Sequence, residues 1–173
     1  MTVDFLHLFH QALFGAMAAS GFGILFNFGW RDIRWCAAGG ALALATRTLG
    51  QDAGWSLEAA AFVAASAVGV AAGLLRAYSG IGGNEFAAAG CIPMVPGALA
   101  AQGIFGLYAL TAPTPTDPAT TLVTAIESIL RALFTMAAIG TGLAITTLML
   151  RSFPRTSLTA IERHELPKLG LKE

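Results

Sequence analysis

The sequence predicts an all-α membrane protein with about five transmembrane helices, and two observations carry this prediction. Only 12% of the 173 residues are charged and 55% are apolar, with a mean hydropathy of +0.68, whereas a soluble domain carries roughly 25% charged residues. A soluble protein of this size has too much surface to bury several wholly apolar helices. The second observation is a set of runs close to the ~20 residues that cross a bilayer and free of Asp, Glu, Lys and Arg: residues 5–30, 59–75, 86–116 and 132–150.

The first two predicted helices are Phe5–Phe28 and Ile33–Leu49. The first has no basic stretch before it and no clear cleavage site after it, so it is predicted to be a retained span rather than a signal peptide. The second is short and contains Arg47, which leaves an interfacial helix as an alternative. Its many alanines and glycines favour a true span, because small side chains let helices pack closely in lipid.

Turn-forming residues separate the last three predicted helices. Glycines precede and follow the third, and prolines separate the fourth from the fifth. These helices are Ser56–Ala77, Phe86–Thr111 and Ala119–Arg151. The chain is thus divided into a five-helix transmembrane domain, residues 1–151, and a short cytosolic tail, residues 152–173.

The distribution of basic residues predicts the orientation of the helices. With five spans and a cytosolic C-terminus, eight of the ten Lys and Arg residues fall on the cytosolic side. The other two, Arg47 and Arg131, lie inside predicted helices. Because basic residues accumulate in cytoplasmic loops, the sequence predicts an external N-terminus and a cytoplasmic C-terminus.

The fourth predicted helix is interrupted by the pattern Pro-x-x-Pro-Gly. Pro93 and Pro96 lack amide protons and disrupt the bonds to the carbonyls four residues earlier, at Ala89 and Ile92, and Gly97 adds backbone freedom. Counted from the cytosolic end of the helix, the break lies ~12–18 Å deep, near the membrane midplane. A half-helix that begins there presents its positive dipole end, as transporters do to bind anionic groups. The sequence therefore predicts a substrate site at these five residues, with a simple packing kink as the alternative.

Four further polar residues are candidates for function. Arg47 is predicted to face a cavity and bind substrate, or else to extend to the outer interface. Asn27 is predicted to touch substrate or to cap a helix. Glu127 and Arg131 stand four residues apart on the last helix, in the order that favours an ion pair. They are predicted to gate transport or couple it to an ion gradient, or else only to stabilise the helix.

Several of these features occur together in one known family. The chain resembles the threonine/serine exporters, and in particular the small subunit of the type whose transporter is split between two chains. The resemblance covers almost the whole chain and rests on residues 23–27, Arg34-Trp35-Cys36, Arg47 and Ile92–Gly97. It implies proton-driven export of small amino acids, or of small carboxylates, across the bacterial inner membrane. It also implies a larger membrane subunit as the partner.

Other classes of function lack support in the sequence. No HExxH or GxSxG motif and no pair of catalytic carboxylates is present, so an enzyme is not predicted. The net charge of zero predicts no nucleic-acid partner, and no cofactor or metal site is expected. Two alternatives stay open: a structural or assembly subunit that does not itself transport, and a homo-oligomeric channel that needs no other subunit.

Overall fold

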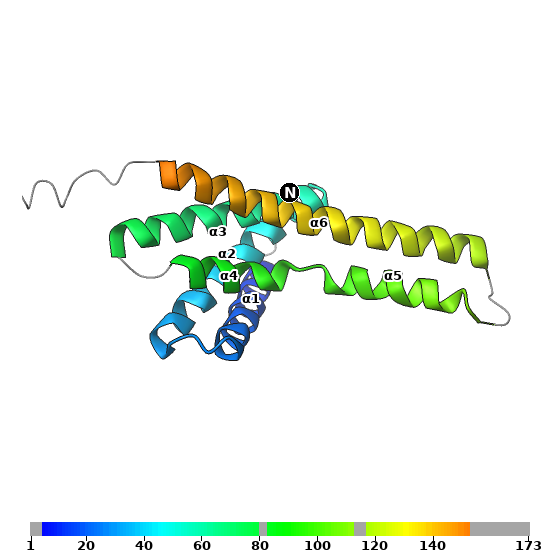
Figure 1. Ribbon diagram of the computed structural model, residues 1–173, viewed down its shortest axis with the longest axis horizontal. Helices are drawn as coiled ribbons and strands as arrows, with labels where there is room; N and C mark the ends of the chain where they lie inside the picture. Colours follow the sequence, from blue (N-terminus) through cyan, green and yellow to red (C-terminus); the bar gives the residue numbers. More distant parts are fainter. Residues whose placement is uncertain (1–4, 80–82, 113–116, 153–173) are drawn as a thin grey trace, which may run out of the picture.

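The computed structural model describes residues 5–79, 83–112 and 117–152, and these ranges contain helices and no strand (Figure 1). The predicted all-α class is therefore confirmed for the described residues. The predicted cytosolic tail lies outside them from residue 153 onward. In chain order the helices are α1 (Phe5–Leu25), α2 (Trp30–Asp52), α3 (Leu57–Ser79), α4 (Gly83–Cys91), the 3-10 helix η1 (Ile92–Met94), α5 (Gly97–Ala109) and α6 (Pro118–Ser152).

Three stretches among the described residues are long and apolar enough to cross a membrane: Phe5–Leu25, Leu57–Arg76 and Pro118–Leu150. The pair Phe86–Met94 and Gly97–Ala109, bent by 43° at a short break, adds a fourth if it is one span. Charged residues near both ends of α2 keep that helix out of this count, although it has 23 residues. The chain is thus a multi-pass membrane protein, and its described residues contain three or four spans by length and composition.

The helix α2 lies at the centre of the fold and packs on α1, α3 and α4. A Cβ atom built at Gly39 would lie 2.7 Å from the carbonyl oxygen of Phe86, and one at Gly90 would lie 2.9 Å from the backbone of Gly39. The backbones of α2 and α4 therefore touch at these glycines. Small residues produce this close approach, as is usual for helices in lipid.

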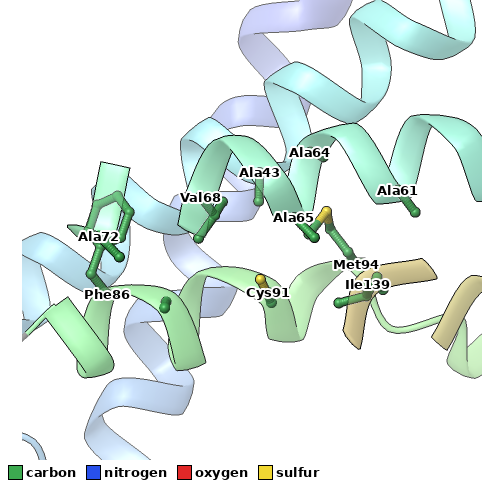
Figure 2. Close-up of a cluster of buried hydrophobic side chains, with 11 residues drawn as sticks. Ala43, Ala61, Ala64, Ala65, Val68, Ala72, Phe86, Cys91, Met94 and Ile139 are labelled. Carbon is green, nitrogen blue, oxygen red and sulfur yellow. The ribbon is translucent and has the colours of Figure 1, made fainter. Parts of the chain in front are cut away.

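The buried apolar core lies where α2, α3, α4 and α6 meet (Figure 2). Most of its members are alanines, so helix backbones rather than large side chains fill the space. Met94 is the largest side chain that is completely buried among the described residues, and in Figure 2 it extends from η1 towards Ala65 of α3. The core members are Ala43, Ala61, Ala64, Ala65, Val68, Ala72, Phe86, Ala87, Cys91, Met94 and Ile139.

Contacts between helices give their relative directions. Gly15 of α1 lies against Gly40 of α2, and Gly23 lies against Cys36, so these two helices are antiparallel. On α3, Gly69 lies against Thr146 of α6, and one turn later Gly73 lies against Leu150. Thus α3 and α6 run in the same direction.

The longest helix, α6, has 35 residues and measures about 52 Å at 1.5 Å per residue. Its C-terminal half packs on α3, and its N-terminal half packs on α5 (Figure 1). Gly103 of α5 lies against Ile129, and Gly106 lies against Ala125, so α5 and α6 form an antiparallel hairpin. In Figure 1 this hairpin extends beyond the body made by α1 to α4.

Candidate functional site

The segment that joins α4 to α5 leaves α-helical geometry over five residues. The 3-10 turn Ile92–Met94 is followed by extended backbone at Val95, with φ −60° and ψ 126°. Pro96, with φ −80° and ψ 55°, precedes the first helical residue of α5, Gly97. Because proline has no amide proton to donate, the α-helical bonding pattern cannot continue through this segment.

Short-range hydrogen bonds satisfy part of this backbone. The amide of Val95 donates to the carbonyl of Ile92 at 3.0 Å, and the amide of Gly97 donates to the carbonyl of Val95 at 2.8 Å. The expectation that the Ile92 carbonyl lacks a donor is therefore wrong, because the 3-10 turn supplies one. Ala89 lies fully buried on α4, one turn before the break.

The two prolines and the glycine differ in their surroundings. Pro93 is half-buried and Pro96 is buried, whereas Gly97 is exposed. A Cβ atom built at Gly97 would meet no other atom within 4 Å. One side of the break is therefore packed in the protein, and the start of α5 is open.

The side chain of Arg47 reaches the break from the C-terminal end of α2. Its Nη1 donates to the carbonyl oxygen of Met94 at 3.4 Å, although the two residues are 47 positions apart. Its Nε is buried and has no hydrogen-bond partner within the described part of the chain. The structure thus brings together two features that the sequence had nominated separately.

This arrangement leaves hydrogen-bonding capacity unused. A guanidinium group carries five N–H donors in a planar fork that matches a carboxylate, and Arg47 makes one long bond to a neutral carbonyl. A buried donor without a partner costs about 1–3 kcal/mol. A carboxylate beside Arg47 would satisfy that donor, so the geometry suits the binding of a small anionic group.

A second group of charges links α3 to α6. Arg131 Nε lies 3.6 Å from Glu58 Oε1, and Arg131 Nη1 lies 3.9 Å from Glu127 Oε1. The predicted pair on α6 is therefore present and has a third member, Glu58, which was not among the residues predicted from the sequence. The acid occurs in the first turn of α3, and only the packing of α3 on α6 brings it to Arg131.

Asn27 caps α1. Its φ of 57° is in the left-handed region, and its amide donates to the carbonyl of Ile24 while the amide of Phe28 donates to that of Gly23. This is the Schellman arrangement, in which asparagine is one of the few residues that fit. Because Asn27 precedes α2 and Arg47 is near its far end, the two are separated by about 25 Å along that helix. The structure does not bring Asn27 to the other candidates.

A polar-lined groove of about 320 Å³ lies between α5 and α6. Ser128 and Thr121 direct their hydroxyl protons to carbonyls of their own helix, which leaves their oxygens able to accept. Gln102 is exposed on α5. The polar members of the lining are Gln102, Thr120, Thr121, Thr124 and Ser128.

Within the described ranges, no three His, Cys, Asp or Glu side chains come together as a metal site requires.

Comparison with known proteins identifies the family. No solved structure matches the chain. The family model described as "Threonine/Serine exporter, ThrE" matches residues 11–149 of the 173. The match spans all seven helices of the fold in whole or in part, and the chain therefore belongs to the threonine/serine exporter family.

Proposed function

We propose that the chain is one subunit of a secondary transporter that exports small amino acids such as threonine and serine, or small carboxylates. One observation supports the location of the site above all others: the buried, unpartnered Nε of Arg47 beside the helix break. In this proposal the substrate carboxylate binds Arg47 bidentately. Ala89, Ile92, Pro93, Pro96 and Gly97 form the backbone wall of the same site.

The start of α5 strengthens this proposal. A helix N-terminus has unpaired amides and the positive end of the helix dipole, and α5 begins at Gly97 with no side-chain cap. A carboxylate between Arg47 and this terminus would meet positive potential on two sides. Discontinuous helices in many transporters hold anionic substrate groups in this way.

We further propose that the chain crosses the membrane five times, with α2 as a full span and α4–η1–α5 as one broken span. The antiparallel packing of α1 on α2 and the parallel packing of α3 on α6 support this topology, because the first and second of five spans run in opposite directions and the third and fifth run in the same direction. Met94 belongs to the same buried cluster as Ile139, which lies near the middle of α6. If α6 crosses the membrane, the break is near the midplane. The excess of basic residues on one side supports an external N-terminus and a cytoplasmic C-terminus in a bacterial inner membrane.

The Glu58–Arg131–Glu127 group is proposed as a gate or coupling element. Its ion pairs are long and part-exposed, so they contribute little to stability, roughly 0–1 kcal/mol each. A long ion pair between separate helices is suited to opening and closing, because breaking the pair costs little. Protonation of Glu58 would break its pair with Arg131 and change the contact between α3 and α6.

A second membrane subunit is proposed as the partner, with a homo-oligomer as the outcome to be tested against it. Lipid suffices for the exposed apolar side chains of the hairpin, but it offers no hydrogen bonds to Gln102 and its neighbouring hydroxyls. Polar side chains on membrane helices usually bond to another helix. The groove between α5 and α6 is therefore the surface where a helix of the larger subunit would pack.

Efflux from vesicles tests the site at Arg47. The native complex would be reconstituted with radiolabelled threonine, serine or succinate, and efflux would be divided by the amount of folded complex. Replacement of Arg47 by Met removes the charge at nearly constant length, and Arg47→Lys keeps the charge but loses the fork. We expect Arg47→Met to reduce efflux at least ~10-fold and Arg47→Lys to recover only part, because a bidentate bond is lost.

The matched control is Arg34→Lys, an arginine at the opposite end of the same helix. Efflux near that of the wild type in Arg47→Met would overturn the proposed site. Wild-type efflux in vesicles that hold only the larger subunit would show that this chain is an assembly subunit. Full efflux by this chain alone would support a homo-oligomeric transporter or channel.

A further inference from the structure

A second groove, with a different chemical character, lies where α1 meets the start of α2. Its volume is about 320 Å³, and its lining includes two arginines and one tryptophan. It is at the opposite end of α2 from Arg47, so it is separate from the proposed transport site. The lining residues are Ser20, Trp30, Arg31, Ile33, Arg34 and Ala37.

Helix geometry explains the composition of this groove. Trp30, Arg34 and Ala37 follow one another at spacings of four and three residues, which puts them on one face of α2. Ser20 supplies the wall from α1, and its hydroxyl proton is bonded to the carbonyl of Ala16. The Ser20 oxygen is therefore left as an acceptor, and the charged donors of the lining are the two arginines.

The two arginines lack acidic partners. Among the described residues, no carboxylate forms an ion pair with Arg31 or Arg34, and Asp32 is not part of the lining. The Arg34 guanidinium lies 5.7 Å from the centroid of the Trp35 ring. This contact orients Arg34 without neutralising its charge. The lining thus includes two positively charged residues and no negatively charged one.

The surface around the groove indicates what kind of anion fits. Trp30 is 86% exposed, as is typical of an aromatic residue at a membrane–water interface. On α1, Ile24 follows Ser20 by four residues and so lies on the same side of the helix, where it is exposed. Leu25 and Phe26, which come next in the chain, are exposed as well. A free phosphate would use only the arginines, whereas a phospholipid would also cover this apolar surface with its acyl chains.

We propose that this groove is a binding site for the phosphate headgroup of an anionic phospholipid. Arg31 and Arg34 bind the phosphate oxygens, Trp30 lies at the level of the glycerol, and the acyl chains pack along α1. Basic pockets between transmembrane helices are known to select such headgroups. The site is independent of the proposed transport function, since none of its residues contacts Arg47 or the break.

Native mass spectrometry of the purified full-length chain tests this site, with phosphatidylglycerol as the probe. We expect one phosphatidylglycerol to stay bound, and Arg31→Ala/Arg34→Ala to weaken its affinity about 30-fold, since each basic residue near the surface contributes roughly a fivefold step. The matched control is Arg76→Ala, which removes an arginine at the end of α3, near the same side of the bundle. This variant should bind as the wild type does.

A second pair of variants separates a defined site from diffuse attraction to positive charge. Ala37→Phe fills the groove and keeps both arginines, and Ser20→Leu does the same from α1 if the first variant does not fold. Either should lose the bound lipid. Retained binding in a folded, filled variant would overturn the proposal, as would unchanged affinity in the double arginine variant.

The source of the phosphate is tested by competition. Phosphatidylcholine should bind weakly, because its headgroup has no net charge, and millimolar inorganic phosphate should not displace phosphatidylglycerol. Equal binding of phosphatidylcholine would overturn the assignment to an anionic headgroup. Displacement by inorganic phosphate would show that the groove takes a free anion rather than a lipid.

Discussion

The two halves of α6 differ in what covers them. The C-terminal half lies against α3 and contributes Ile139 to the buried core. The N-terminal half lies mainly against α5, and Arg131 near its end also contacts Glu58 of α3. Both halves expose large apolar side chains, such as Phe134 at 62% and Met149 at 64%, so the difference between them is that only the C-terminal half contributes to the buried core. The C-terminal half and the helices of the core are called here the finished bundle, and the N-terminal half with α5 is called the open hairpin.

The candidate site lies at the boundary between these halves. Arg47 and Met94 belong to the finished bundle, whereas Gly97 and α5 belong to the open hairpin. A substrate at the boundary would contact the finished bundle on one side. On the other side it would contact the open hairpin, on which the proposed second subunit packs. Such a division suits alternating access, in which one packed body moves against another.

The largest expected effect comes from removing the break between α4 and α5, so that the two form one continuous helix. Replacing Pro93 and Pro96 with Ala restores two amide donors and lets α4 continue into α5, which removes the 43° bend. The far end of α5 would then move by on the order of 10 Å from its place on α6. We expect efflux per folded complex to fall at least ~10-fold. Insertion should persist, because an interior proline costs ~3 kcal/mol in a helix.

The control for this variant is Pro118→Ala, which alters a proline at the first position of α6, where no helical bond is lost. If the break is only a packing kink, the double variant should assemble poorly but transport normally once assembled. Efflux normalised to folded complex distinguishes the two outcomes, and a near-normal value would end the site hypothesis.

A smaller effect, on stability, is expected from adding a methyl group where α3 and α6 are in close contact. A Cβ atom at Gly142 would lie 2.7 Å from the backbone carbonyl oxygen of Phe62, so α3 and α6 would have to separate. We expect Gly142→Ala to lower the free energy of unfolding by roughly 1–3 kcal/mol. Thermal unfolding in detergent, followed by circular dichroism, measures this change.

The same helix offers the matched control. Gly140 has no atom within 4 Å of its would-be Cβ, and Gly140→Ala should stabilise α6 by up to ~1 kcal/mol through helix propensity. In the open half, a Cβ atom at Gly103 would meet the half-buried side chain of Ile129 first and the carbonyl oxygen of Ala125 at 3.1 Å. A side chain shifts more readily than a backbone carbonyl. Its effect should be smaller than that of Gly142→Ala, and the opposite ranking would contradict the comparison between the halves.

The sequence predicted what depends on covalent structure and local composition. Charge-free runs indicated the helices, and Pro93 and Pro96 indicated where the fourth would be interrupted, because a missing amide proton is a property of the residue itself. Helix ends were less well predicted. The first helix ends at Leu25 rather than Phe28, since Asn27 adopts the left-handed turn, and α2 is longer at both ends because its charged residues do not stop a helix.

Contacts between distant segments were beyond the reach of sequence patterns. Arg47 was selected because a charge inside a span is costly, but its bond to Met94 depends on the alignment of α2 beside α4. Glu58 was missed because its approach to Arg131 depends on the alignment of α3 beside α6. Spacing along one helix revealed the Glu127–Arg131 pair, and no spacing could reveal the third member.

The ion group allows a test of the contact between α3 and α6. Glu58→Gln removes the link between helices, while Glu127→Gln removes a link within α6. Because all three side chains are part-exposed, neither change should alter stability by more than about 1 kcal/mol. If the group is a gate, Glu58→Gln should change the pH dependence of efflux severalfold, and Glu127→Gln should change it less. Equal pH profiles for the wild type and both variants would assign the group a purely structural role.

The smallest expected effect is confined to the open half, at the start of α6. Asp117 Oδ1 accepts the amide proton of Thr120 at 3.3 Å, and the hydrogen bonds from Thr120 lower the pKa of Asp117. A carboxyl whose pKa is lower in the folded protein adds stability above its unfolded pKa, and that stability is lost as the pH falls through the folded value. Acid should therefore loosen the first turn of α6, and Asp117→Asn should keep the cap but remove this pH dependence. Hydrogen exchange at residues 118–122 measures the change, with α3 as the internal reference. Faster exchange in α3 as well would show that the hairpin and the bundle unfold together, against the division between the two halves of α6.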